Sequence, residues 1–146
     1  MGAITPFFML DVACDEAARH YASIFKDSKI HDSSPMQASF RLNGQEFMAF
    51  RGGPSFEFGQ ALSLYISCKD QAEIDHYWNG LSSGGGEGLM CGWVRDKYGC
   101  SWQVVPETLG AMLSDAKKGN SQGAMAAMMK MHKLDIKALE KAYKTK

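Results

Sequence analysis

Residues 40–50 read FRLNGQEFMAF and residues 93–105 read WVRDKYGCSWQVV, and these two stretches decide the fold. Each places apolar residues on both sides of a short turn that contains glycine. Asn43-Gly44 is a strong hairpin signal, because both central residues of a type I′ turn need a positive φ. The second turn, at residues 96–99, joins two expected strands at residues 90–95 and 101–105, and it ends in a glycine 55 positions after the first one. We therefore expect two β-hairpins at corresponding places in an internal repeat.

The repeat includes the segments that precede the hairpins. His20-Tyr21 recurs as His76-Tyr77 at an offset of 56, and both pairs lie among apolar residues at helical spacing. Short apolar runs at residues 4–10 and 61–67 come before these helices and are typical of buried strands. Each half is therefore predicted to be a βαβββ module, although the glycine-rich residues 82–88 leave little room for the second strand of the second module.

The repeat also predicts how the chain is divided. The first βαβββ module occupies residues 1–53, the second occupies residues 54–106, and a C-terminal helical extension occupies residues 107–146, all within one structural domain. The fold class is α+β. Residues 135–144 are expected to form the last helix of the extension, with Asp135 as its cap. An extension of this kind commonly covers a sheet edge or packs on a partner subunit.

The composition argues against several classes of protein. Sixteen Lys and Arg residues balance sixteen Asp and Glu residues, so no basic field is available to hold nucleic acid. No apolar run reaches the roughly 20 residues of a membrane helix, and no signal peptide is recognisable. We therefore expect a cytoplasmic protein without nucleic-acid or membrane partners. The four cysteines form no C-x-x-C pair, which argues against a structural zinc site.

Four stretches carry a family resemblance: ITPFFMLD (4–11), FRLNGQEFMAFRGG (40–53), CGWVRDKYGCSWQVVP (91–106) and MMKMHKLDIKALEKAY (128–143). Together they resemble the PhnB-like branch of the vicinal oxygen chelate superfamily, which includes glyoxalases, dioxygenases and bleomycin-resistance proteins. That branch is often labelled demethylubiquinone methyltransferase-like. The resemblance implies paired modules whose curved mixed sheets surround a cleft, with helices on the opposite faces. It also implies a homodimer.

The resemblance shows where a metal would be held. Catalytic members of the superfamily bind a divalent metal through His and Glu residues in the first and last strands of each module. The matching positions here are Phe7, Phe8 and Met48 in the first module, and Ser63 and Gln103 in the second. None of these side chains is charged, and a neutral pair of oxygen donors is a poor trap for a divalent ion. Because this sequence departs from the family's ligand pattern at these positions, we expect no metal site and no cofactor.

Strand alternation predicts which side chains face the cleft. Phe47, Trp102 and Val104 should face the helices, whereas Ser101 and Val105 should share the cleft side. Phe40 is placed with the cleft residues. The predicted ligand-binding cleft, which is apolar and aromatic with two polar groups, consists of Phe8, Met48, Phe50, Ser63, Trp93 and Gln103. Such a lining suits a small organic molecule.

Three functions remain open, and no catalytic residue is assigned. The favoured one is a metal-free small-molecule-binding protein, similar to the antibiotic-sequestering members of the superfamily, in which aromatic stacking and buried area supply affinity. The alternative is a metal-dependent lyase, isomerase or dioxygenase with atypical ligands. The third is a structural or regulatory dimer without a small ligand.

Three further features bear on methyl transfer, thiol chemistry and a histidine near the cleft. Gly84-Gly85-Gly86 follows a helix, whereas a nucleotide-binding glycine turn follows a strand, so the methyltransferase label is doubtful. A reactive thiol at Cys91 would need a cationic neighbour such as Arg95 to lower its pKa. His31 could reach the cleft from its rim, and the roles of Cys91 and His31 stay open.

Overall fold

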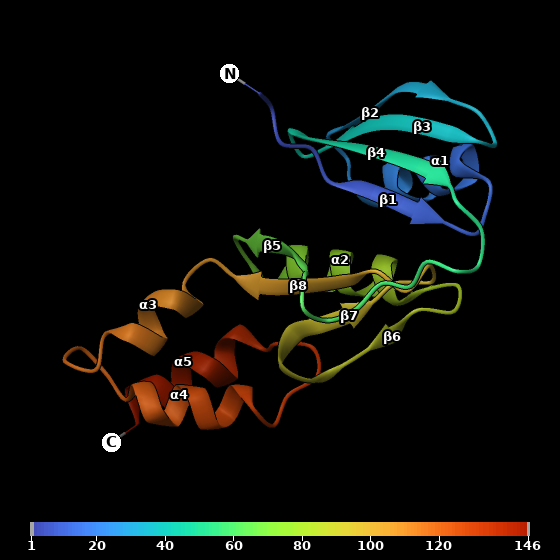
Figure 1. Ribbon diagram of the computed structural model, residues 1–146. Helices are drawn as coiled ribbons and strands as arrows, with labels where there is room; N and C mark the ends of the chain where they lie inside the picture. The colour runs from blue at the N-terminus through green and yellow to red at the C-terminus, as the bar shows by residue number, and fades with distance from the viewer. Residues whose placement is uncertain (1, 146) are drawn as a thin grey trace. The chain divides into compact units, whose positions relative to one another are not determined.

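The computed structural model describes residues 2–145, and the chain divides into two compact units, Met1–Glu57 and Phe58–Lys146. The first unit holds one βαβββ module, and the second holds the other module together with the C-terminal helices (Figure 1). Each module forms its own open four-stranded mixed sheet. The predicted α+β fold of two βαβββ modules followed by helices is therefore confirmed, and neither sheet closes into a barrel.

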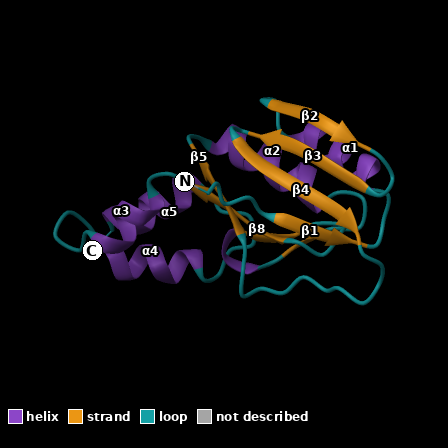
Figure 2. Ribbon diagram, turned by 45° about the horizontal axis from the view of Figure 1, so that its top comes forward, coloured by secondary structure: helices purple, strands orange, loops and turns teal. Residues whose placement is uncertain are grey.

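The first unit is a four-stranded sheet with the order β1-β4-β3-β2, in which β1 runs parallel to β4. Asn43 and Gly44 have φ values of 48° and 85°, so the hairpin between β3 and β4 has the two positive φ angles that its sequence predicted. One helix packs on one face of the sheet (Figures 1 and 2). The elements are β1 (Phe7–Leu10), α1 (Cys14–Ile24), β2 (Ser28–Ser33), β3 (Gln37–Leu42) and β4 (Gln45–Arg51).

An aromatic cluster fills the space between α1 and this sheet. Tyr21 stacks on Phe40 with the ring centroids 6.0 Å apart, and Phe40 stacks on Phe47 at 5.6 Å. Phe8 packs against Phe47 at 5.6 Å and is 4% exposed. The predictions that Phe8 and Phe40 face the open side of the sheet are therefore wrong. Strand alternation instead turns Phe7 to the open side, where it is 51% exposed.

The second unit repeats the topology with the sheet order β5-β8-β7-β6 and β5 parallel to β8. As the glycine-rich segment indicated, its second strand is only two residues long. The predicted strand at residues 90–95 is shorter than expected, because the chain turns at Cys91 and Gly92, where φ is 62° and 82°. The elements are β5 (Leu64–Cys68), α2 (Gln71–Ser82), β6 (Glu87–Gly88), the 3₁₀ turn η1 (Met90–Gly92), β7 (Trp93–Arg95) and β8 (Ser101–Pro106).

The cores of the two modules confirm the repeat. Ala18 and Tyr21 of α1 are fully buried, and so is Ile74 of α2, while the repeat-equivalent Tyr77 is 9% exposed. Trp102 and Val104 of β8 face α2 and are buried, as strand alternation predicted. A further buried pair, Phe25 and Leu81, stands at the same repeat offset.

Three helices follow β8 and form an apolar cluster with Val105, which they cover. Pro106 ends β8, and the first of these helices begins at Leu109. Asp135 caps the last helix as predicted, because its carboxylate accepts a hydrogen bond from the Ala138 N–H. The helices are α3 (Leu109–Ser114), α4 (Ser121–Met128) and α5 (Ile136–Lys144).

Residues 131–136, here called the clip, fasten this extension to the second module. The N–H groups of Cys91 and Gly92 donate to the carbonyl oxygens of Met131 and His132 at 2.8 and 2.9 Å. The Gln71 side chain holds the clip from α2: its amide nitrogen donates to the Leu134 carbonyl, and its amide oxygen accepts from the Ile136 N–H. Lys133 also forms an ion pair with Asp75 at 3.1 Å.

The ion pair between Lys133 and Asp75 should make the hydrogen bonding of the clip depend on pH. Hydrogen bonds from Gln71 and Lys133 hold the pKa of Asp75 below its ordinary value of 3.8. A carboxyl whose pKa is lowered by folding stabilises the folded state above its unfolded pKa and loses that contribution as the pH falls through its folded pKa. Amide exchange should therefore show weaker protection of the Ile136 N–H below pH 3.8, and Asp75→Asn should lack this loss. An equal loss of protection in both proteins would assign the effect to another group.

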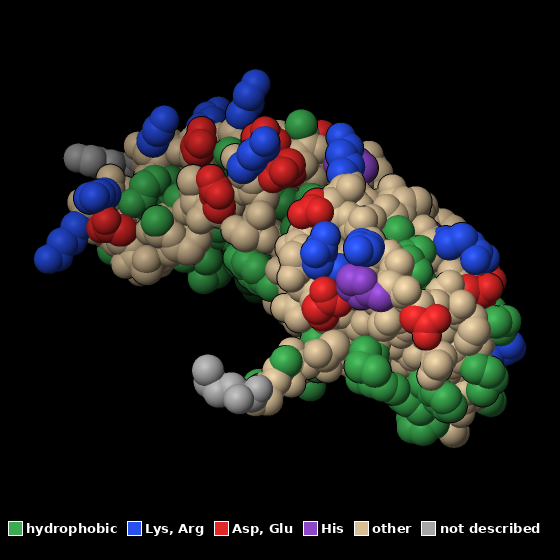
Figure 3. Space-filling model, turned by 90° about the horizontal axis from the view of Figure 1, so that it is seen from above, with side chains coloured by type: hydrophobic (Ala, Val, Ile, Leu, Met, Phe, Trp, Pro, Cys, Tyr) green, Lys and Arg blue, Asp and Glu red, His purple; other side chains and the backbone are tan. Residues whose placement is uncertain are grey.

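Surface features agree with the balanced composition. Basic and acidic side chains are interspersed on the face shown in Figure 3 and form no continuous basic patch there. Among residues 2–145, no helix has the length and apolar character needed to span a membrane.

Candidate functional site

A row of three side chains crosses the face of the second sheet that lies opposite α2. Tyr65 of β5 stands across from Gln103 of β8, and Gln103 stands across from Trp93 of β7. The Gln103 amide nitrogen donates to the Ser63 hydroxyl oxygen at 2.9 Å, which fixes the orientation of the amide. Tyr65 is 58% exposed, and its pKa is raised by partial burial, so the phenol keeps its proton at neutral pH.

The first sheet carries an equivalent row. Phe7 of β1 stands across from Met48 of β4, and Met48 stands across from Ser39 of β3. Phe50 lies on the same face two residues along β4 and is 38% exposed. These residues line a small hollow of about 130 Å³, together with Asp32 and Gln37 among others. His31 forms a 2.8 Å hydrogen bond with Glu46, which lies on this face by alternation.

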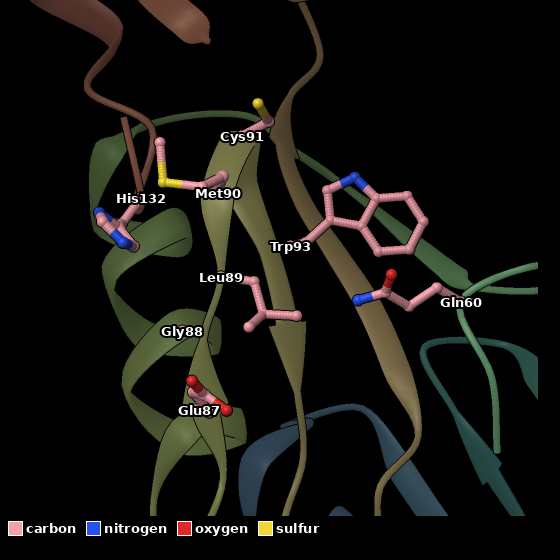
Figure 4. A pocket seen from close by; sticks show the side chains of 8 residues that line it. All are labelled: Gln60, Glu87, Gly88, Leu89, Met90, Cys91, Trp93 and His132. Carbon is pink, nitrogen blue, oxygen red and sulfur yellow. The ribbon is translucent and has the colours of Figure 1, made fainter. Parts of the chain in front are cut away.

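A larger hollow of about 600 Å³ begins at Trp93 in the second unit (Figure 4). The Trp93 indole and the Gln60 side chain line one part of it, and Leu89 and Met90 supply apolar surface. The remaining lining residues are Glu87, Gly88, Cys91 and His132. Glu87 is occupied by an ion pair with Arg95. The hollow therefore combines an aromatic ring, apolar side chains, a few polar groups and one carboxylate that is paired with Arg95.

Most of the predicted cleft residues lie on the sheet faces opposite helices α1 and α2. Ser63, Trp93 and Gln103 come together in the second unit, and Met48 and Phe50 come together in the first. Two other residues predicted to face the cleft, Ser101 and Val105, are buried, since the Ser101 hydroxyl donates to the Gly59 carbonyl and the extension covers Val105.

Several lining residues were missed by the sequence reasoning. Tyr65 could have been found, because it shares strand parity with Ser63. Leu89 and Met90 could not have been found in this way, since the segment that begins at Met90 was expected to be a strand and not a turn. No local signal indicates His132, which reaches the hollow only through the folded extension.

The donor set does not suit a hard divalent cation. The facing residues of the two rows, Phe7 with Met48 and Tyr65 with Gln103, carry no charged side chain. Among the described residues, no three His, Cys, Asp or Glu side chains lie close enough to hold a metal ion.

The four cysteines differ sharply in their surroundings. Cys14, Cys68 and Cys100 are buried, and burial raises the pKa of the Cys68 thiol to about 12. Cys91 is partly exposed, and its Sγ lies 3.7 Å from the Sδ of Met129 in the extension. Arg95 pairs with Glu87, so the geometry gives no support to Arg95 as an activating cation for Cys91.

The comparisons with known proteins agree with this architecture. The family model described as 3-demethylubiquinone-9 3-methyltransferase matches residues 2–105. A putative 3-demethylubiquinone-9 3-methyltransferase, PhnB protein, from Bacillus cereus is 32% identical, with a TM-score of 0.64 over 71% of this chain and 99% of that one. No curated protein matches the chain.

Two more distant structures share the fold. Protein PA1353 from Pseudomonas aeruginosa is 18% identical, with a TM-score of 0.60 over 73% of this chain and 98% of that one. A possible glyoxalase from Bacillus cereus is 14% identical, with a TM-score of 0.52 over 70% of this chain and 96% of that one. The family match ends at residue 105, so helices α3, α4 and α5 lie outside it. The chain belongs to the PhnB-like family described as 3-demethylubiquinone-9 3-methyltransferase, and it shares its fold with a possible glyoxalase.

Proposed function

We propose that this chain binds a small planar organic molecule on the uncovered face of its second sheet, without a divalent metal chelate. The observation that carries the proposal is the Tyr65–Gln103–Trp93 row, which stands beside a hollow of about 600 Å³. Cavities of this size, with apolar walls and a few placed polar groups, are typical of small-molecule sites.

Each side chain in the site has a distinct role in the proposal. The Trp93 indole offers a flat apolar surface on which a planar ligand stacks. Because the Gln103 amide nitrogen already donates to Ser63, the amide oxygen of Gln103 and the hydroxyl hydrogen of Ser63 remain to orient the ligand. Leu89 and Met90 supply the apolar area whose burial provides most of the affinity. In the first unit, Met48 and Phe50 offer a smaller apolar surface of the same kind.

The uncharged side chains of the two rows favour binding over metal chelation, and the arrangement of strands and helices argues against methyl transfer. Chelation of neighbouring substrate oxygens needs a charged ligand set, and the row positions Phe7, Met48, Tyr65 and Gln103 do not provide one. The family description names methyl transfer, but the glycine-rich segment Gly84–Gly86 follows α2 instead of a strand, and the sheets are mixed.

Two further parts of the proposal concern assembly and location. We propose a cytoplasmic homodimer, because most soluble oligomers are closed and symmetric and the dimer is their commonest form. Sedimentation equilibrium would measure the mass of the assembly.

A thermal-shift screen against planar aromatic metabolites tests the binding proposal. A compound that stabilises the protein should lose at least about tenfold in affinity with Trp93→Ala, since the stacking surface is removed. Gln103→Ala should weaken binding less, and Leu62→Ala, at a side chain that is 81% exposed, serves as the control.

Two outcomes would contradict the proposal. One is a complete absence of stabilising compounds, or stabilisation that is unchanged in Trp93→Ala. The other is a stoichiometric divalent metal in protein purified without chelator that is lost in Gln103→Ala, which would instead support a metal-dependent lyase, isomerase or dioxygenase.

A further inference from the structure

Three polar side chains beside Trp93 are uncharged, and two of them have defined hydrogen-bonding directions. Gln103 lies across from Trp93 on one side and from Tyr65 on the other. Its amide nitrogen donates to the Ser63 hydroxyl oxygen at 2.9 Å, which leaves the amide oxygen as an acceptor and the hydroxyl hydrogen as a donor. On the basis of the binding function proposed above, we infer that the ligand is a planar ring with a cyclic amide edge, in which an N–H lies next to a carbonyl oxygen.

The hydrogen bond between Gln103 and Ser63 sets the order of the groups that meet the ligand. Because the two side chains are joined at 2.9 Å, they present an acceptor next to a donor. A cyclic amide presents the complementary order: its N–H donates to the Gln103 oxygen while its carbonyl accepts from the Ser63 hydroxyl. A quinone or a lactone offers acceptors alone, so it leaves the Gln103 oxygen without a donor when the bound ring covers it, which costs free energy.

Tyr65 supplies a second hydroxyl donor on the same face. The register of β5 and β8 places it opposite Gln103, on the side away from Trp93. Partial burial raises the pKa of the phenol, which therefore keeps its proton and donates at neutral pH. An imide, which has a carbonyl on each side of its N–H, offers acceptors for both hydroxyl donors and belongs to the same class of ligand.

The charges around the hollow favour a ligand that is neutral. Glu87, the carboxylate that lines it, is paired with Arg95, and none of the described residues in the lining is Lys or Arg. A carboxylate or phosphate ligand would therefore bury a charge without a cation to pair with, which is costly. An amide edge provides directional hydrogen bonds without a net charge, while Trp93 stacks on the plane of the same ring (Figure 4).

Calorimetric titration of the full chain with two matched bicyclic rings tests the preference for an amide edge. Isocarbostyril carries a cyclic amide, and isocoumarin has nearly the same shape but a ring oxygen in place of the N–H. We expect isocarbostyril to bind at least about tenfold more tightly, because it alone satisfies the Gln103 oxygen. Naphthoquinone, which offers acceptors alone, should bind no more tightly than isocoumarin.

A pair of glutamine variants assigns this difference to one side chain. Gln103→Met keeps the length of the side chain but removes the amide, so the two rings should then bind with affinities within about twofold of each other. Gln122→Met makes the same change at an exposed residue of α4 and should retain the full difference. Circular dichroism of each variant verifies that it is folded before its affinities are compared.

The outcomes separate the amide preference from the binding function on which it rests. Equal affinities of the two rings, both weakened by Trp93→Ala, would overturn the amide preference and leave planar-ligand binding intact. Tighter binding of isocoumarin or naphthoquinone would mean that Gln103 turns its nitrogen to the ligand, contrary to the inference. A difference that persists in Gln103→Met, or failure of both rings where other planar compounds bind, would also exclude recognition of an amide edge by Gln103. Failure of every planar compound would contradict the binding function itself.

Discussion

Replacing Asp96 with alanine is expected to lower the free energy of unfolding by about 3 kcal/mol or more, because it strips a buried turn of its acceptor. Asp96 is 2% exposed. One carboxylate oxygen accepts from the N–H groups of Tyr98 and Cys100, and the other accepts from the Trp102 indole N–H at 2.8 Å. Alanine would leave these donors without their acceptor, and each unsatisfied buried donor costs about 1–3 kcal/mol.

Urea unfolding followed by tryptophan fluorescence measures this effect, and two variants make it specific. Asp96→Asn keeps the shape but offers one acceptor oxygen, so its loss should be smaller than that of the alanine variant. Trp102→Phe removes one donor and leaves the turn intact, so a double-mutant cycle with Asp96→Asn isolates the indole hydrogen bond. A loss below about 1 kcal/mol in Asp96→Ala would show that water replaces the carboxylate, contrary to the expectation.

The same turn explains why so much of the fold could be predicted from the sequence. Asn43-Gly44 and the D-x-x-G turn at residues 96–99 each fix the register of a hairpin, and the register determines which face each side chain meets. The predicted orientations of Met48, Phe50 and Gln103 follow from it. Repetition of the pattern at a nearly constant offset then identified the second module independently of any single motif.

The misplaced residues have two different physical causes. β1 is an uninterrupted apolar run, so no polar residue marks its alternation, and its parity is set by pairing with β4 some forty residues away. Phe8 could not be oriented from that local pattern. Phe40, by contrast, stands between Ser39 and Arg41, and this alternation already indicates the buried face that the structure shows.

Long-range contacts account for what sequence reasoning missed around the hollow. Residues 90–92 have the apolar character of a strand, but hydrogen bonds from Cys91 and Gly92 to the clip hold them in a turn with positive φ. His132 enters the hollow through the same contact. Neither feature has a local signature, because both depend on a segment that lies forty residues further along the chain and outside the family match.

Leu134 is the apolar centre of that contact, and Leu134→Ala is expected to cost about 3 kcal/mol of unfolding free energy, as cavity-forming leucine substitutions typically do. Its side chain is fully buried in the cluster that joins the extension to Val105. It also lies against Gly92, where an added Cβ would come within 3.0 Å of Leu134. The substitution therefore leaves a cavity between the extension and η1.

The location of the cavity leads to a second expectation, which concerns the exchange of two backbone amides. Leu134→Ala should reduce the exchange protection of the Cys91 and Gly92 amides, because those amides donate to the clip that Leu134 anchors. Leu62→Ala, at a side chain that is 81% exposed, should change neither stability nor protection appreciably. If Leu134→Ala lowered stability but left both amides protected, η1 would be held by its own module. The extension would then cover the second module without shaping its hollow, and ligand binding at Trp93 should survive in a variant whose clip is loosened.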